Sequence, residues 1–326
     1  MGFAVSLLDG ALSRGKRLMS TLEERRALRV LEHRIRTILP EEYQDSYQDV
    51  EPVSMGSAGL TFGRDGRVAW NDVWGSFCDL AMAGGPPHKG KLLMSATREE
   101  VEAEPARYAQ VTAEICRGIR LVTGLTARPS PVAGWVRIQC DNAVAAGWLA
   151  RAIVMENVSA RCEDAALDLP AGPGFQVEKE IKNVITAIAK TAHYWQEHVW
   201  TARQNVIKAL FAKISLESPL IQPAVDGHDF EAEMDHLLGR NISAKIFETT
   251  GLIPWHVRCD GWVGAVCPSV KTAIWMMRAL VVSNVFARRE DQVLFVSVNP
   301  KTDPSGAVAS GAVSKVHGLA RVAGVV

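Results

Sequence analysis

The stretch Trp135-Val136-Arg137-Ile138-Gln139-Cys140 returns later in the chain as Trp262-Val263-Gly264-Ala265-Val266-Cys267. One constant offset, without a gap, also relates Thr123-Gly124-Leu125 to Thr250-Gly251-Leu252, Trp148 to Trp275, Arg151 to Arg278, Asn157 to Asn284 and Arg161 to Arg288. Self-similarity at a fixed period indicates repeated units of structure. The sequence therefore predicts an internal duplication.

Each predicted unit has the order helix, strand, helix and hairpin. In the first copy these elements are a helix ending near Thr123, a strand over 135–140, a helix over 142–156 and a hairpin pairing 158–162 with 166–169. A lone unit would leave one sheet face bare, so we expect the copies to pair about a pseudo-two-fold axis. Apolar residues at helical spacing from Val177 to Ile214 predict a long central helix between them.

The predicted fold class is α+β, with duplicated α-β-α-ββ units. The predicted divisions are an N-terminal region over 1–108, a first repeat over 109–176, a central helix and linker over 177–226, and a second repeat over 227–326. In the N-terminal region, residues 21–39 predict an amphipathic helix with one apolar stripe, which would pack on its own domain or on a partner subunit. A hairpin is expected to join 60–62 to 68–70 through a glycine-containing turn.

Composition narrows the classes of function. The 326 residues carry no net charge, because Lys+Arg and Asp+Glu both number 36, and this argues against a nucleic-acid partner. No apolar run is long enough to cross a bilayer, so no membrane partner is expected. The six cysteines contain no CxxC pair, which predicts reduced thiols and a cytoplasmic location.

The loop Gly84-Gly85-Pro86-Pro87-His88-Lys89-Gly90-Lys91 is the first candidate site. His88 could act as a general acid or base, with help from Lys89, while Lys91 and the backbone of Gly84 and Gly85 could hold an anion. The Gly/Lys spacing is not that of a phosphate-binding Walker A loop. The alternative interpretation is an exposed basic loop.

Cys140 is a candidate nucleophile. It ends a predicted strand directly before a helix, where the helix dipole would lower the pKa of a thiol. Cys267 holds the same position in the second copy, and presence in both copies favours a role in packing instead.

Histidines suggest a metal or cofactor site as an alternative function. His193 and Glu197 are four residues apart and would share one helix face, whereas His193 and His198 would point apart on an α-helix. A second group spans 228–236, where Glu233 and His236 have the spacing found in di-iron helices. A solvated acidic helix start is the alternative for that group, and the sequence identifies no particular metal or cofactor.

A feature present in one copy only is a better candidate for function than a repeated one. By this reasoning we expect a cytoplasmic enzyme that acts on a small anionic metabolite, a carboxylate or a phosphate, in a groove beside the first repeat. Arg151 and His193 would line that groove, and the reaction would be acid/base chemistry of a lyase, isomerase or hydrolase type. The alternatives are a metal- or cofactor-binding protein and a non-catalytic assembly subunit, and a homo-oligomer is possible.

Overall fold

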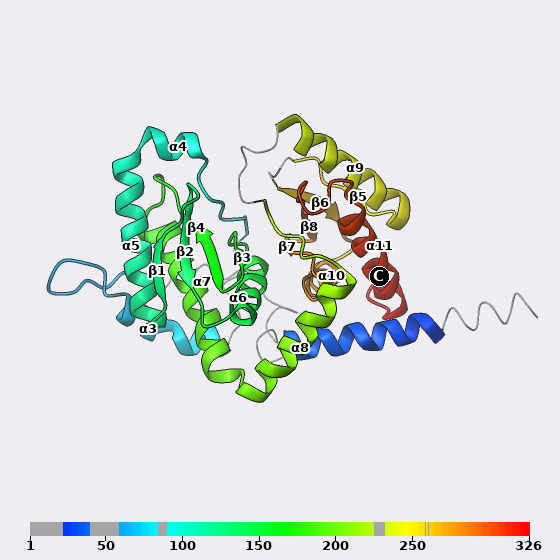
Figure 1. Cartoon of the computed structure of the whole chain (residues 1–326), viewed down its shortest axis with the longest axis horizontal. Helices are drawn as coiled ribbons and strands as arrows, with labels where there is room; N and C mark the ends of the chain where they lie inside the picture. The colour runs from blue at the N-terminus through cyan, green and yellow to red at the C-terminus, as the bar shows by residue number, and fades with distance from the viewer. Residues whose placement is uncertain (1–21, 40–58, 84–89, 225–231, 258, 260) are drawn as a thin grey trace, which may run out of the picture.

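The computed structural model describes residues 22–39, 59–83, 90–224, 232–257, 259 and 261–326. These residues form a mixture of helices and strands, which confirms the predicted α+β class at that level. Two sheets lie side by side, each with its own group of helices (Figure 1). Within the described ranges, no helix is long and apolar enough to cross a membrane.

Both described sheets have four antiparallel strands in corresponding orders. The first is β1-β2-β4-β3, made of Thr126–Pro129, Trp135–Gln139, Ala166–Pro170 and Arg161–Glu163. The second is β5-β6-β8-β7, made of Ile253–Pro254, Trp262–Val266, Val293–Ser297 and Ala287–Glu290. The predicted hairpins are therefore present, with Cys162 facing Leu167 and Arg289 facing Leu294.

The predicted α-β-α-ββ order is wrong in one respect, because each unit has an extra strand before the repeated one. β1 buries only Ala127, and it ends in Pro129. A short edge strand that contains a proline carries no alternating apolar pattern, so the sequence did not mark it.

Two helices pack on each sheet, and a third helix packs on those two. In the first unit α5 (Pro105–Thr123) and α6 (Ala143–Met155) cover one face, and α7 (Lys182–His193) packs behind both. In the second unit α9 (Ala232–Thr250), α10 (Val270–Val281) and α11 (Ala307–Val322) take the corresponding places. The predicted boundary at residue 176 thus separates α7 from the helices on which it packs.

Local backbone features recur at the repeated positions. Gly124 and Gly251 both end a helix in the left-handed region, at φ 72° and 75°. Asn157 and Asn284 also have positive φ values, 58° and 63°, which asparagine tolerates better than most residues. These turns direct the chain from the middle helix of each unit into its hairpin.

The predicted continuous central helix is wrong. The segment consists of a π-helical turn η3 (Val177–Ile181), α7, a second π turn η4 (Tyr194–His198) and, after a break at Val199 and Trp200, α8 (Thr201–Glu217). The Gln204 side chain donates to the carbonyl oxygens of Trp195 (3.2 Å) and Val199 (2.8 Å), which satisfies groups exposed by the break. Val199 is buried, so the apolar pattern continues across a point where the helix does not.

The N-terminal helix, residues 22–38, lies along the base of the molecule beside α8 and α11 (Figure 1). Leu31, Ile35 and Ile38 of its predicted stripe are buried. Arg34 forms an ion pair of 2.5 Å with Glu217 at the end of α8. The helix therefore packs on α8 and α11 of the same chain, which belong to the predicted linker and second repeat and not to the predicted N-terminal region.

Candidate small-molecule pocket

The pocket lies where a short hairpin approaches α5 and η3. Phe62 and Val68 face each other across this hairpin, and Gly66 takes the left-handed conformation (φ 73°) that closes the turn. The hairpin prediction is thus confirmed in this region, and α3 (Trp70–Ala83) begins two residues after Val68. Phe62 is 62% exposed, which leaves an aromatic ring at the mouth of the pocket.

Glu114 anchors the hairpin to α5. Its carboxylate accepts hydrogen bonds from Trp70 Nε1 (2.8 Å) and Arg117 Nε (2.8 Å), and Arg67 Nη2 lies 3.3 Å from it. Burial acts to raise the pKa of Glu114, but the hydrogen bonds from Arg117 and Trp70 outweigh it and hold the pKa below its usual range. The charge of Glu114 is therefore neutralised within the protein. Its role is structural, because it holds the hairpin against α5 in the wall of the pocket.

The π turn η3 forms the third side of the pocket. The amide of Ile181 donates to the Gln176 carbonyl (3.1 Å), and the Gln176 amide donates to the carboxylate of Glu180 (2.9 Å). The wider π turn places Val177, Glu178 and Ile181 along the pocket. Single π turns occur often at functional sites.

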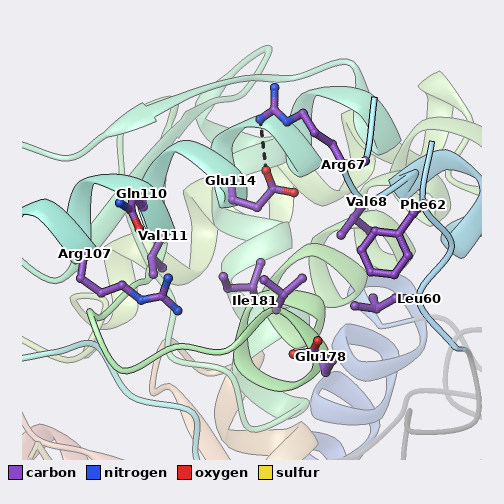
Figure 2. A pocket seen from close by; sticks show the side chains of 12 residues that line it. Leu60, Phe62, Arg67, Val68, Arg107, Gln110, Val111, Glu114, Glu178 and Ile181 are labelled. Atoms are coloured by element: carbon purple, nitrogen blue, oxygen red, sulfur yellow. Dashed lines mark hydrogen bonds and ion pairs between the residues drawn. The ribbon is translucent and has the colours of Figure 1, made fainter. Parts of the chain in front are cut away.

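The cavity has a volume of about 310 Å³. Its lining residues are Leu60, Phe62, Gly66, Arg67, Val68, Arg107, Gln110, Val111, Glu114, Val177, Glu178 and Ile181. Figure 2 shows Ile181 in the middle, with Val111 and Arg107 on the left, Glu178 below and the ring of Phe62 on the right. This volume suits a small metabolite, because pockets for larger ligands extend to about 1,000 Å³.

Two charges in the pocket are not neutralised by the protein. Arg107 makes one long hydrogen bond, 3.5 Å from Nη2 to the Phe175 carbonyl, and forms no ion pair with a described residue. Glu178 forms neither a hydrogen bond nor an ion pair with the described part of the chain. Lys182, four residues further on, is buried, and the π turn changes the helical phase between the two residues.

Most of the predicted loop site cannot be placed. Gly84, Gly85, His88 and Lys89 lie outside the described residues, as does the group at 228–231 with the side chains up to His236. Lys91 is described and exposed. It lies two residues before Leu93, which pairs with Val158 beside the first sheet.

Cys140 has the opposite of the expected acidity. Its side chain is buried, and this burial, together with the nearby charge of Asp141, raises the pKa of the thiol to about 12. Burial also raises the pKa of Cys267 to about 12. The prediction of a lowered thiol pKa is wrong, because removal from water outweighs the helix dipole.

Arg151 does not line a groove. It is fully enclosed between the units, where it donates to the carbonyl oxygens of Val281 (3.2 Å) and Gly147 (2.8 Å) and to Asn284 Oδ1 (2.6 Å). Its guanidinium also lies 4.3 Å from the ring centroid of Phe211. Desolvation lowers the pKa of Arg151 to about 10, and its hydrogen bonds make it a structural link.

His193 lies at the other end of α7 from the pocket, beside the second π turn. Its Nδ1 atom is 3.4 Å from Glu197, so the predicted pairing on one face is confirmed. The prediction that His193 and His198 point apart is wrong, since their ring centroids are 5.5 Å apart. Residues 194–198 form a π turn, and the α-helical angle per residue does not apply there.

The metal-binding alternative has no support from the described side chains, among which no group of three or more candidate ligands comes together. The six cysteines form no disulfide in the described structure. Comparisons with protein-family models, with curated proteins and with solved structures gave no significant match. The geometry of the pocket is therefore the basis for the functional proposal.

Sequence reasoning missed the pocket residues. Arg107, Gln110, Val111 and Glu114 have the i, i+3, i+4, i+7 spacing of one helix face, which could have indicated a shared surface. The sequence carried no signal for the approach of Glu178 and Phe62 to that face, because they come from segments far apart along the chain.

Proposed function

We propose that the protein binds a small anionic metabolite in the pocket between the hairpin, α5 and η3, beside the first unit. The observation that carries this proposal is the Arg107 guanidinium, which opens onto an apolar floor without a carboxylate partner. A guanidinium holds carboxylate and phosphate groups through paired N–H donors. Phe62 and Ile181 offer apolar contacts for the rest of the ligand.

Ligand-observed NMR with hexanoate tests this proposal. We expect hexanoate to bind the unmodified protein, and Arg107→Gln to weaken binding about fivefold, the size of a solvent-exposed charge contact. Arg98→Gln is the matched control, because Arg98 is an exposed arginine on the neighbouring helix α4 (Arg98–Ala103) and does not line the pocket. Equal binding by all three proteins, or no binding at all, would overturn the proposal.

A second proposed function is acid/base catalysis at the second π turn, where His193 packs against Trp74 of α3 with ring centroids 6.0 Å apart. Glu197 lies 3.4 Å from the partly exposed His193, and a carboxylate beside an imidazole holds its ring in one orientation. This pair lies at the other end of α7 from Ile181 of the pocket, so the chemistry would be separate from anion binding by Arg107.

Hydrogen exchange into substrates tests the catalytic proposal without knowledge of the product. Pyruvate and dihydroxyacetone phosphate would be incubated with the protein in D₂O, and loss of their carbon-bound hydrogen signals would be followed by NMR. We expect faster exchange than in buffer, and a return to the buffer rate in His193→Ala or His88→Ala. Exchange at the buffer rate with unmodified protein contradicts an acid/base enzyme for these two probes.

The internal duplication is a proposal about the origin of the fold. It is supported by the matched bounds of α5 and α9, of β2 and β6, and of β4 and β8, all at the sequence offset. We also propose that the two units are related by a pseudo-two-fold axis, that the protein is cytoplasmic and that it forms a homo-oligomer. Sedimentation of the purified protein over a range of concentrations would test the last.

A further inference from the structure

From the same pocket we infer the class of its ligand: a small zwitterion whose anionic group contacts Arg107 and whose amine contacts Glu178. This inference rests on the proposed binding function and adds a second charge to the ligand. Three features support the zwitterion: two charges in the pocket have no partner, the second unit lacks both charges, and the floor between them is small and apolar.

The four charged residues of the lining divide into two kinds. Arg67 and Glu114 contact each other at 3.3 Å, and Arg117 behind them contacts Glu114 as well. Arg107 and Glu178 have no such partner among the described residues, and they are too far apart to form an ion pair with each other. One unneutralised cation and one unneutralised anion therefore face the same cavity (Figure 2).

The second unit shows that the fold does not need these charges. At the constant offset, Arg107 corresponds to Met234 and Glu178 to Ser305. Helices α5 and α9 nevertheless have the same length and end in the same glycine turn. The charges belong to the first unit alone, as expected of residues that serve a ligand and not the framework.

The floor between the two charges is apolar. Val111 and Ile181 are buried beneath the cavity, while Leu60 and Phe62 form its hairpin side. A ligand that bridges Arg107 and Glu178 would lay a hydrocarbon body across this floor. A cavity of about 310 Å³ is at the small end of the range for ligand pockets, which suits a short amino acid.

The test compares four probes of equal chain length by ligand-observed NMR: 6-aminohexanoate, hexanoate, hexylamine and hexanol. We expect 6-aminohexanoate to bind about fivefold more tightly than hexanoate, because one further solvent-exposed charge contact is added. Both charged contacts should weaken as salt is added, since ions screen exposed pairs.

The variant Glu178→Gln separates this inference from the binding function beneath it. We expect it to reduce the affinity for 6-aminohexanoate to that for hexanoate and to leave hexanoate binding unchanged. Glu102→Gln is the control, because Glu102 is an exposed glutamate on α4 outside the pocket. Thermal unfolding of each variant would show that the fold is retained.

The possible failures are distinguishable. Equal affinity for 6-aminohexanoate and hexanoate, or a preference for the zwitterion that survives Glu178→Gln, overturns the zwitterion and leaves the anion site standing. Hexylamine binding that exceeds hexanoate binding and does not depend on Arg107 overturns both proposals. Binding of hexanol as tight as that of the charged probes, or binding of none of the probes, overturns both as well.

Discussion

Arg151 and Asn284 join the two units through a hydrogen bond of 2.6 Å from Nη2 to Oδ1. The arginine comes from α6 of the first unit, and the asparagine lies in the turn between α10 and β7 of the second. All three hydrogen-bond acceptors of Arg151 are uncharged oxygens, and the ring of Phe211 covers its guanidinium. Asn284 also donates to the Ser218 carbonyl at 2.9 Å, so this asparagine ties the linker after α8 to the same junction.

We predict that Arg151→Met lowers the free energy of unfolding by roughly 2–4 kcal/mol, because buried oxygens would lose their donors. Urea denaturation followed by circular dichroism would measure this change. Arg128→Met is the control, since Arg128 is exposed on β1, and its effect should stay within about 0.5 kcal/mol. A similar loss in both variants would show that the junction contributes no more than a surface position.

Two corresponding glycines should differ in their tolerance of a side chain. Gly134 and Gly261 both have positive φ, 83° and 73°, but a Cβ atom on Gly134 would lie 2.1 Å from the Ala96 carbonyl oxygen, whereas one on Gly261 would meet nothing within 4 Å. We expect Gly261→Ala to cost about 1–2 kcal/mol from backbone conformation alone. Gly134→Ala should lower the free energy of unfolding clearly more than Gly261→Ala does. Equal shifts in the urea denaturation midpoint of the two variants would show that the Ala96 carbonyl does not restrict residue 134.

Lys190 should make stability depend on pH. It is buried 3.7 Å from Glu156, and desolvation lowers its pKa from 10.5 to about 8. Between pH 8 and 10.5 the unfolded chain therefore binds more protons at this site than the folded chain, so the Lys190 contribution to stability increases as pH rises, by roughly 3 kcal/mol in all.

The comparison that isolates this contribution is with the double variant Lys190→Met and Glu156→Gln, which removes both charges. Urea denaturation at pH 7, 8, 9 and 10 should show a more positive slope of unfolding free energy against pH in the unmodified protein. Identical slopes would show that Lys190 keeps its ordinary pKa in the folded state.

Cys140 should resist thiol reagents in the folded protein. Because Cys140 is buried and its pKa is about 12, little of its thiol is ionised at pH 8. Cys162 is partly exposed and is the comparison within the same protein. Mass spectrometry after a brief iodoacetamide pulse should find Cys140 unmodified until urea is added. Rapid labelling of Cys140 in the native protein would revive its candidacy as a nucleophile.

Much of the framework could be predicted from the chain. The match of Trp135–Cys140 with Trp262–Cys267 located β2 and β6, and Asn142, Gly124 and the Glu163-Asp164 turn marked the limits of neighbouring elements. Local chemistry governs these features, since caps and turns depend on a few adjacent residues. β1 was missed because it has no alternating apolar pattern, and the break at Val199 was missed because the apolar pattern continues across it.

The sequence by itself determined the mixed helix and sheet content, the repeated order of elements and the turns between them, because these follow from side-chain periodicity and backbone preference. Only the tertiary structure decided which charges remain without a partner. It enclosed Arg151 at the junction, surrounded Glu114 with donors and left Arg107 and Glu178 facing one cavity. Neutralisation and desolvation depend on neighbours brought from distant parts of the chain, and that information is not local to any segment.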